Sequence, residues 1–327
     1  MKKYYKIVFT DYYFPDIKKE IKQLEELGEI EVIDCNYLVE GEVASEDQLI
    51  DHLQKNNALD ADAVFVNHAH LTEKFISRLT NCKVILRYGI GIDNIDAKFA
   101  QKKGIKVSNV PNYCIIEVAE NTIALMIATV RKIFFQNKLL RNQQFDYEKV
   151  KPIRRFSDLT VGLLAFGNIA RKVAERLKGF GVKIIAHDPY FEDKDSFEWI
   201  EFVSFEQLLK NSDVLSVHAP LNEETYHLIN QKVIENMKKG IFIINTSRGG
   251  LIDEQALYDA LVNGKIAGAG LDLLEYKDEN EYVKSKLMDL DNVFITPHTS
   301  WYSEEAVYDL QIKAGKIVYQ ELLKVNK

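Results

Sequence analysis

Short apolar runs alternate with segments of helical spacing over the first hundred residues. We predict strands at 5–10, 30–34, 63–67 and 84–87, and helices at 16–27, 45–54 and 72–79. Strands that alternate with helices in this way are typical of a parallel sheet with helices on its faces. The pattern therefore predicts an α/β domain at the start of the chain.

The alternation resumes in the second half, beginning with a strand–helix–strand unit. Residues 161–166 form an apolar run, the stripe Ile169, Val173, Leu177 and Phe180 has helical spacing, and 182–186 form a second run. Further strands are predicted at 214–217, 241–244, 267–271 and 293–295. Ligands of open parallel sheets bind beyond the carboxyl ends of the strands, so the polar residues that follow these strands are candidates for a site.

Two other helical segments bear on the domain organisation. Residues 116–142 are predicted as one long helix, apolar nearly all round between 122 and 130. Such a helix is buried between layers or packs against another subunit, and we favour a homodimer. A last helix, 303–325, has nothing to pair with in the second half and is expected to cover the first sheet. We therefore expect a discontinuous domain of residues 1–105 and 300–327, with a second domain, 106–299, inserted in it.

Composition and charge narrow the class of protein. The chain has 327 residues, a formal net charge of −7 and 46% hydrophobic residues. An acidic balance argues against nucleic acid or an anionic membrane as the main partner. No run of eighteen apolar residues predicts a membrane span, and the N-terminus does not resemble a signal peptide. Cys35, Cys82 and Cys114 are few, widely spaced and not at metal-ligand spacing, which favours the cytoplasm and no metal site.

The turn after the run 161–166 has the layout of a dinucleotide-binding motif. Gly167 lets the backbone approach a pyrophosphate, whose charge is favoured by the helix N-terminus, and the small Ala170 allows close packing of helix on strand. Asp188 follows the second strand, where its carboxylate can accept hydrogen bonds from ribose hydroxyls and repel a 2′-phosphate. We therefore predict NAD rather than NADP. The first and third glycines of the usual motif are alanines here, Ala165 and Ala170.

A second glycine-rich turn follows the strand at 84–87. Gly89, Ile90 and Gly91 lie where backbone amides can surround an anion. A plain turn is an equally good interpretation of this loop from its residues alone.

Several segments, taken together and in order, resemble the D-isomer-specific 2-hydroxyacid dehydrogenases. They cover most of the chain from residue 84 onward and are RYGIGIDNID (87–96), NVPNYCIIEVAENTIAL (109–125), the nucleotide turn, NTSRGGLID (245–253), GAGLDLLE (268–275) and TPHTSWYSEEA (296–306). Within that family the last segment looks most like the branch of C-terminal-binding proteins, NAD-binding dimers.

The resemblance implies roles for individual residues. Arg248 matches the arginine that orients a 2-keto acid, and His298 matches the acid/base that exchanges a proton with the substrate oxygen. The amides of Gly89 and Ile90 match the loop that binds the substrate carboxylate, and Trp301 would narrow the substrate pocket. The positions that match cofactor contacts are Thr122, Gly167, Asn168, Ile169, Asp188, Pro220, Thr246 and Asp272.

One position departs from the family pattern. The glutamate that pairs with the catalytic histidine lies 29 residues after the arginine, and that position is Lys277 here. A lysine beside His298 disfavours the protonated imidazole, whereas a carboxylate favours it. Glu275, Asp278 or Glu279 could take over after a small shift of the loop, and we take Glu279 as the stand-in.

The expected fold is α/β, with two doubly wound parallel-sheet domains: a Rossmann nucleotide-binding domain inserted in a flavodoxin-like substrate domain. The expected function is hydride transfer between NAD(H) and a small 2-keto or D-2-hydroxy acid, by a homodimer formed through the nucleotide-binding domain. Lys277 keeps an alternative open, an NAD-sensing dimer with little or no turnover, like the C-terminal-binding proteins.

Overall fold

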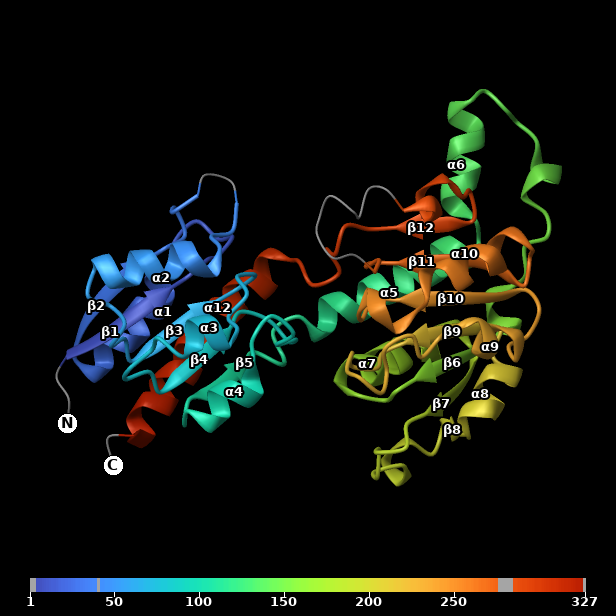
Figure 1. Cartoon of the computed structure of the whole chain (residues 1–327). Helices are drawn as coiled ribbons and strands as arrows, with labels where there is room; N and C mark the ends of the chain where they lie inside the picture. The colour runs from blue at the N-terminus through green and yellow to red at the C-terminus, as the bar shows by residue number, and fades with distance from the viewer. Residues whose placement is uncertain (1–3, 40–41, 276–284, 326–327) are drawn as a thin grey trace. The chain divides into compact units, whose positions relative to one another are not determined.

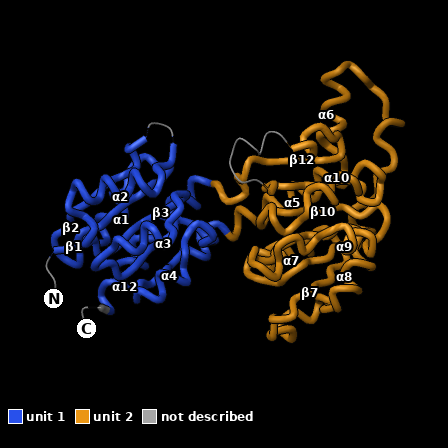
Figure 2. The backbone as a smooth tube through the Cα atoms, in the orientation of Figure 1, with its two compact units in different colours: residues 1–114, 303–327 blue, residues 115–302 orange. Residues whose placement is uncertain are grey.

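The protein folds into two compact units, which Figure 2 shows in blue and orange. The computed structural model describes residues 4–39, 42–275 and 285–325. Unit 1 contains residues 1–114 and 303–327, and unit 2 contains 115–302. The sequence predicts domain boundaries at residues 105 and 300. In the structure, residues 106–109 pair with the neighbouring strand of the first sheet, so they belong to unit 1.

Unit 1 is built on a parallel sheet that has five strands within the described residues, in the order β2-β1-β3-β4-β5. This is the flavodoxin-like order that we expected. The strands are β1 (Tyr4–Phe9), β2 (Glu29–Asp34), β3 (Ala63–Val66), β4 (Val84–Arg87) and β5 (Lys106–Asn109). The helices are α1 (Lys18–Leu24), α2 (Glu46–Lys55), α3 (Glu73–Ile76), α4 (Ala97–Lys102) and α12 (Glu304–Val325) (Figure 1).

The last helix, α12, completes unit 1, as the sequence predicted. Its buried hydrophobic side chains recur at every fourth position, which gives one apolar stripe: Ala306, Leu310, Ala314, Val318 and Leu322. The helix contacts α1 and β4. Gly315 of α12 lies against the α1 backbone, since a Cβ there would be 3.1 Å from the Cα of Glu20.

Unit 2 is a parallel sheet with seven strands among the described residues, in the order β12-β11-β10-β9-β6-β7-β8. The strands are β6 (Thr160–Leu164), β7 (Lys183–His187), β8 (Glu201–Phe202), β9 (Val214–Val217), β10 (Ile241–Asn245), β11 (Ile266–Leu271) and β12 (Val293–Ile295). The helices are α5 (Ile115–Val130), α6 (Ile133–Arg141), α7 (Asn168–Leu177), α8 (Phe205–Asn211), α9 (Gln231–Glu235) and α10 (Glu254–Val262). The strand order reverses direction between β6 and β9, which is where such folds bind nucleotides.

The predicted long helix at 116–142 is wrong in one respect. The helix is interrupted at Lys132, whose φ of 53° is left-handed, and α5 and α6 are separate helices. The apolar α5 packs inside unit 2 against α7, β10 and β11, which explains its composition without a second subunit. None of the helices in the described part of the chain has the length and apolar character needed to cross a membrane.

Candidate functional site

The nucleotide turn lies between β6 and α7. Ala165 has a φ of 68°, a conformation that glycine adopts without strain, and its amide donates to the His187 carbonyl at 2.8 Å. Gly167 is the N-cap of α7, and a Cβ added there would have no atom within 4 Å. Among the described residues no side chain caps this helix N-terminus. Its first amides are therefore available to an anion.

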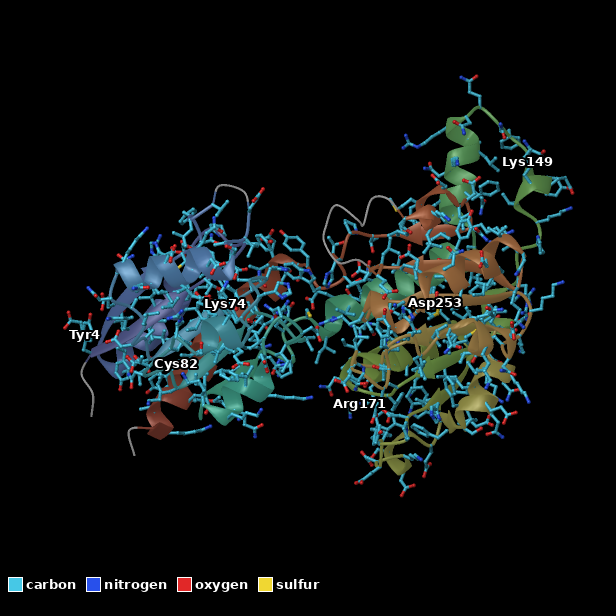
Figure 3. The ribbon with its side chains drawn as sticks, in the orientation of Figure 1. Tyr4, Lys74, Cys82, Lys149, Arg171 and Asp253 are labelled. Carbon is cyan, nitrogen blue, oxygen red and sulfur yellow. The ribbon has the colours of Figure 1, made fainter. Side chains whose placement is uncertain are left out.

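Asp188 bonds directly to this turn. One carboxylate oxygen accepts the Phe166 amide at 2.8 Å and the other accepts the Tyr190 amide at 2.9 Å. The structure thus places Asp188 beside the Gly167 turn, as the strand–helix–strand pattern predicted. On the first turn of α7, Asn168 accepts a hydrogen bond from Arg171, which Figure 3 labels.

The strand on the other side of β6 contributes His218 and Pro220. The His218 amide donates to the Leu164 carbonyl at 2.8 Å, so this segment lies beside the end of β6. The imidazole Nε2 is 2.9 Å from the hydroxyl of buried Ser216, and burial lowers the pKa of His218 to about 4. His218 is therefore neutral at physiological pH. Pro220, two residues further on, is exposed.

Thr122 and Thr246 meet although 124 positions separate them. Thr122 lies on α5 and Thr246 follows β10, and their hydroxyl oxygens are 2.8 Å apart. Thr122 has no exposed surface and also donates to the Val118 carbonyl. Thr122 is therefore a buried partner of the Thr246 hydroxyl.

Arg248 lies on a tight turn after β10. The Asn245 side chain donates to the Arg248 carbonyl at 2.9 Å, and the guanidinium donates to the Ser247 carbonyl at 2.7 Å. Gly249 follows, and a Cβ there would be 2.0 Å from the Leu274 carbonyl oxygen. The turn that carries Arg248 is thus pressed against the segment that leaves β11.

Asp272, at the end of β11, organises the segment that carries His298. The buried carboxylate accepts the Thr296 hydroxyl and the amides of Thr299 and Ser300 at 2.5–3.0 Å. Burial raises the pKa of Asp272, against the effect of these hydrogen bonds. The Asp272 carbonyl accepts the His298 amide at 2.8 Å. His298 has a φ of 53°, a conformation that is uncommon outside glycine and often occurs at functional sites.

Glu275 has partners other than His298. Its carboxylate accepts the Tyr226 hydroxyl at 2.6 Å and lies 2.7 Å from Nε2 of His227. These contacts argue against Glu275 as the acid partner of His298. Lys277, Asp278 and Glu279 lie outside the described residues.

The glycine loop of unit 1 is tightly constrained. Gly89 has a φ of 147°, and a Cβ there would be 1.4 Å from Nη1 of Arg87, so only glycine fits. The Asn109 side chain donates to the Ile90 carbonyl at 2.5 Å, and the Val110 amide donates to the Gly89 carbonyl at 2.9 Å. In unit 2, Trp301 is half-buried and its ring centroid lies 5.5 Å from that of Tyr302.

Comparison with known proteins decides the family. Residues 123–300 match the family described as "D-isomer specific 2-hydroxyacid dehydrogenase, NAD binding domain". The chain belongs to the D-isomer-specific 2-hydroxyacid dehydrogenases. NAD is therefore its cofactor, and it is an oxidoreductase of the 2-hydroxy and 2-keto acid class.

Three dehydrogenases and reductases illustrate the likeness. Hydroxypyruvate reductase of Thermotoga maritima is 40% identical and the match covers 83% of this chain and 90% of that one. D-3-phosphoglycerate dehydrogenase of Methanocaldococcus jannaschii is 37% identical over 98% of this chain, which spans only 57% of that relative. The structure of D-lactate dehydrogenase from Aquifex aeolicus with NAD and lactic acid gives a TM-score of 0.82 at 28% identity, covering 97% of this chain and 95% of that one. These relatives give no support to the NAD-sensor alternative or to the branch of C-terminal-binding proteins.

The residues of unit 2 fit the NAD that this dehydrogenase family uses. The open space at Gly167 and the uncapped amides of α7 suit a pyrophosphate, and Asp188 retains lone pairs for ribose hydroxyls. Sequence reasoning missed the pair His227–Glu275 and the burial of His218. His227 and Glu275 are 48 positions apart in the chain, so no local sequence pattern indicates that they pair.

Proposed function

We propose that the protein transfers hydride reversibly between NAD(H) and a small 2-keto or D-2-hydroxy acid. The observation that carries this proposal is the strand order of unit 2. Arg248, Asp272 and His298 follow within three residues of the carboxyl ends of the adjacent strands β10, β11 and β12. A guanidinium, a buried carboxyl and an imidazole thus follow three neighbouring strand ends. The nucleotide turn and Asp188 follow β6 and β7 at the same carboxyl edge of this sheet.

The roles proposed for the chain's residues are those of binding, orientation and proton transfer. NAD, when bound, supplies or accepts the hydride. Arg248 orients the carboxylate and carbonyl of the acid by two parallel hydrogen bonds, and the amides of Gly89 and Ile90 bind the carboxylate. His298 donates a proton to the carbonyl oxygen during reduction and removes it in the reverse direction. Trp301 narrows the pocket for the acid's side chain.

Unit 2 holds the cofactor at three places: the pyrophosphate, the adenosine ribose and the nicotinamide. Gly167, Asn168 and Ile169 bind the pyrophosphate at the start of α7, and Asp188 binds the adenosine ribose. Around the nicotinamide we propose Pro220, Thr246 with Thr122 behind it, and Asp272. The three bonds that Asp272 accepts from residues 296–300 support this arrangement, because they fix the His298 segment to the same carboxyl group.

Steady-state oxidation of NADH by a panel of 2-keto acids, including pyruvate, hydroxypyruvate and glyoxylate, tests the proposal. His298→Asn and Arg248→Lys should each lower kcat/KM by about 10²–10⁴ while NADH still binds. Arg154→Lys is the matched control, since Arg154 is an exposed arginine held by Asp213. Turnover of no acid, or full activity in His298→Asn, would contradict the proposal.

We also propose a homodimer formed through unit 2. Helix α6 and the loop after it extend from the sheet (Figure 1). They carry exposed apolar side chains. Phe134 and Leu140 on α6 are 43% and 59% exposed, and Phe145 in the loop is 96% exposed. Phe134 also lines a cavity of about 320 Å³, together with Phe135 and Phe294. Exposed aromatic and other large apolar side chains are enriched at protein interfaces.

Light scattering tests the dimer. Leu140→Lys and Phe145→Asp together should shift the molar mass from two chains to one. Val262→Lys is the control, because Val262 is also exposed near the end of a helix in unit 2. A wild type with the mass of one chain would contradict the dimer. We propose the cytoplasm as the compartment, since cysteines are few in this chain and Cys35, Cys82 and Cys114 are all buried.

A further inference from the structure

Unit 1 contains a fully buried carboxyl group that the proposed reaction does not use. Glu20 lies on α1 and has no exposed surface. One of its oxygens accepts the Tyr88 hydroxyl at 2.8 Å, and the other accepts the Gln311 side-chain amide at 3.1 Å. A buried carboxyl is costly unless it is hydrogen-bonded, so these two contacts are what makes its position tolerable. They join α1, the end of β4 and α12.

Tyr88 is the residue immediately before Gly89. Its ring is 1% exposed and lies 5.0 Å from the Phe14 ring and 5.4 Å from the Phe65 ring, centroid to centroid. Its amide donates to the Val66 carbonyl at 2.8 Å. Apolar contacts fix the plane of the ring, and the bond to Glu20 fixes its outer end. Gly89 and Ile90 are the next two residues of the backbone, so they follow directly after a residue whose side chain is fixed in this way.

Gln311 fixes the carboxyl of Glu20 from the side of α12. Its side-chain amide also donates to the Asp16 carbonyl at 2.7 Å, and its oxygen accepts the Lys19 ammonium at 2.8 Å. Every polar atom of the Gln311 side chain is therefore directed at α1 or the turn before it. The carboxyl of Glu20 is held in one place from two sides.

We propose that Glu20 is a positioning residue for the reaction: fixed by Gln311, it holds Tyr88 and so places the Gly89 and Ile90 amides for the substrate carboxylate. This inference rests on the proposed function. It adds that the apparent affinity for the acid depends on a group that does not touch the acid.

The charge state of Glu20 sets how strongly it holds Tyr88. Burial raises the pKa of Glu20 to about 7, while its bonds from Tyr88 and Gln311 and the charge of Lys19 act in the opposite direction. Burial raises the pKa of Tyr88, and the charge of Glu20, with smaller effects of Tyr12 and Asp11, acts in the same direction. A carboxylate accepts a hydroxyl more strongly than a neutral carboxylic acid does. The loop is therefore held more firmly above pH 7 than below it.

Steady-state kinetics between pH 5.5 and 8.5 test the inference. Tyr88→Phe removes the hydroxyl, and Glu20→Gln keeps an acceptor but has no charge. At pH 8.5 each variant should raise KM for the acid about three- to tenfold, the effect of one charge-assisted hydrogen bond, with kcat and KM for NADH unchanged. The ratio of KM for Glu20→Gln to that of wild type should fall toward one at pH 5.5. Taking this ratio cancels the titration of His298. Together the two substitutions should raise KM little more than Tyr88→Phe alone.

Tyr12→Phe is the matched control. Tyr12 also donates its hydroxyl to a carboxylate, that of Asp34 at 2.7 Å, and it lies in the same unit. It should lower the thermal midpoint comparably and leave KM for the acid unchanged. Equal KM values for wild type and both test variants at every pH would overturn the inference, as would equal effects of Tyr12→Phe and Tyr88→Phe. A wild type that turns over no 2-keto acid overturns the proposed function and this inference together, whereas normal turnover with unchanged KM in the variants overturns this inference alone.

Discussion

Asp188 bonds to the turn after β6, which we propose as the pyrophosphate site. Its two oxygens hold the Phe166 and Tyr190 amides, and the same carboxylate is proposed to bind the ribose. Asp188→Ala should therefore weaken NADH binding about tenfold or more and narrow the preference over NADPH, since the charge that repels a 2′-phosphate is lost. Fluorescence titration with both cofactors measures this. An unchanged ratio of the two dissociation constants would place Asp188 away from the ribose.

The burial of Glu20 also makes stability depend on pH. The pKa of Glu20 is about 7 in the folded protein against an ordinary value of 4.5, so folding favours its protonated form. The contribution of protonated Glu20 to the free energy of unfolding is complete below pH 4.5 and is lost as pH rises from 4.5 to 7. Wild type should thus lose about 3 kcal/mol more than Glu20→Gln over this range. Urea unfolding of both proteins at pH 5 and pH 8 checks it, and parallel losses would show that Glu20 does not titrate within this range.

At this scale the sequence predicted the neighbourhood of residues that lie close in the chain. Gly167 and Asp188 lie in one strand–helix–strand unit, and Asp188 bonds the Phe166 amide next to Gly167. Glu20 could not be predicted, because it is a glutamate among lysines on a short helix and both of its partners, Tyr88 and Gln311, are distant in the chain. The left-handed φ of Ala165 was equally hidden, since alanine rarely adopts it.

Among the elements, the strands were predicted more closely than the helices. The apolar runs at 63–67, 161–166 and 214–217 became the buried strands β3, β6 and β9, because a parallel sheet covered on both faces requires apolar side chains at its centre. The break between α5 and α6 was missed because Lys132 is an ordinary helix former and gives no stop signal. The segment 276–284, which carries the expected partner of His298, lies outside the described residues.

The packing of the Arg248 turn on the end of β11 gives a prediction at the scale of elements. Gly249→Ala places a Cβ 2.0 Å from the Leu274 carbonyl, so the turn must move away from β11. We expect kcat/KM to fall at least tenfold with NADH binding largely retained, because Arg248 is displaced while the nucleotide turn is not. Gly264→Ala, at the end of α10 where a Cβ meets no atom, is the control for backbone strain, since its φ of 73° disfavours alanine on its own. Equal activity losses in the two variants would contradict the displacement.

For the whole molecule, the return of α12 to unit 1 means that each end of the chain depends on the other. Val318→Asp puts a charge into the fully buried stripe of α12 and should destabilise unit 1 by several kcal/mol. Unit 2 should keep its affinity for NADH, because its residues, 115–302, include every proposed cofactor contact. Differential scanning calorimetry with NADH titration checks this. If Val318→Asp lost NADH binding at a temperature where unit 2 is still folded, the independence of unit 2 would be contradicted.

The contact of Glu20 with Gln311 spans 291 positions, and this has a consequence for how the protein is made. The sheet of unit 1 leaves the ribosome before unit 2, whereas α12, which covers this sheet, leaves after unit 2. The 188 residues of unit 2 are synthesised in between, which takes about 10–40 s at ~5–20 residues per second. During that time the face that will receive Leu310, Val318 and Leu322 has no cover, so the nascent chain is a natural client for a chaperone that shields apolar surface. Unit 2 can finish folding before the N-terminal sheet that was made ahead of it.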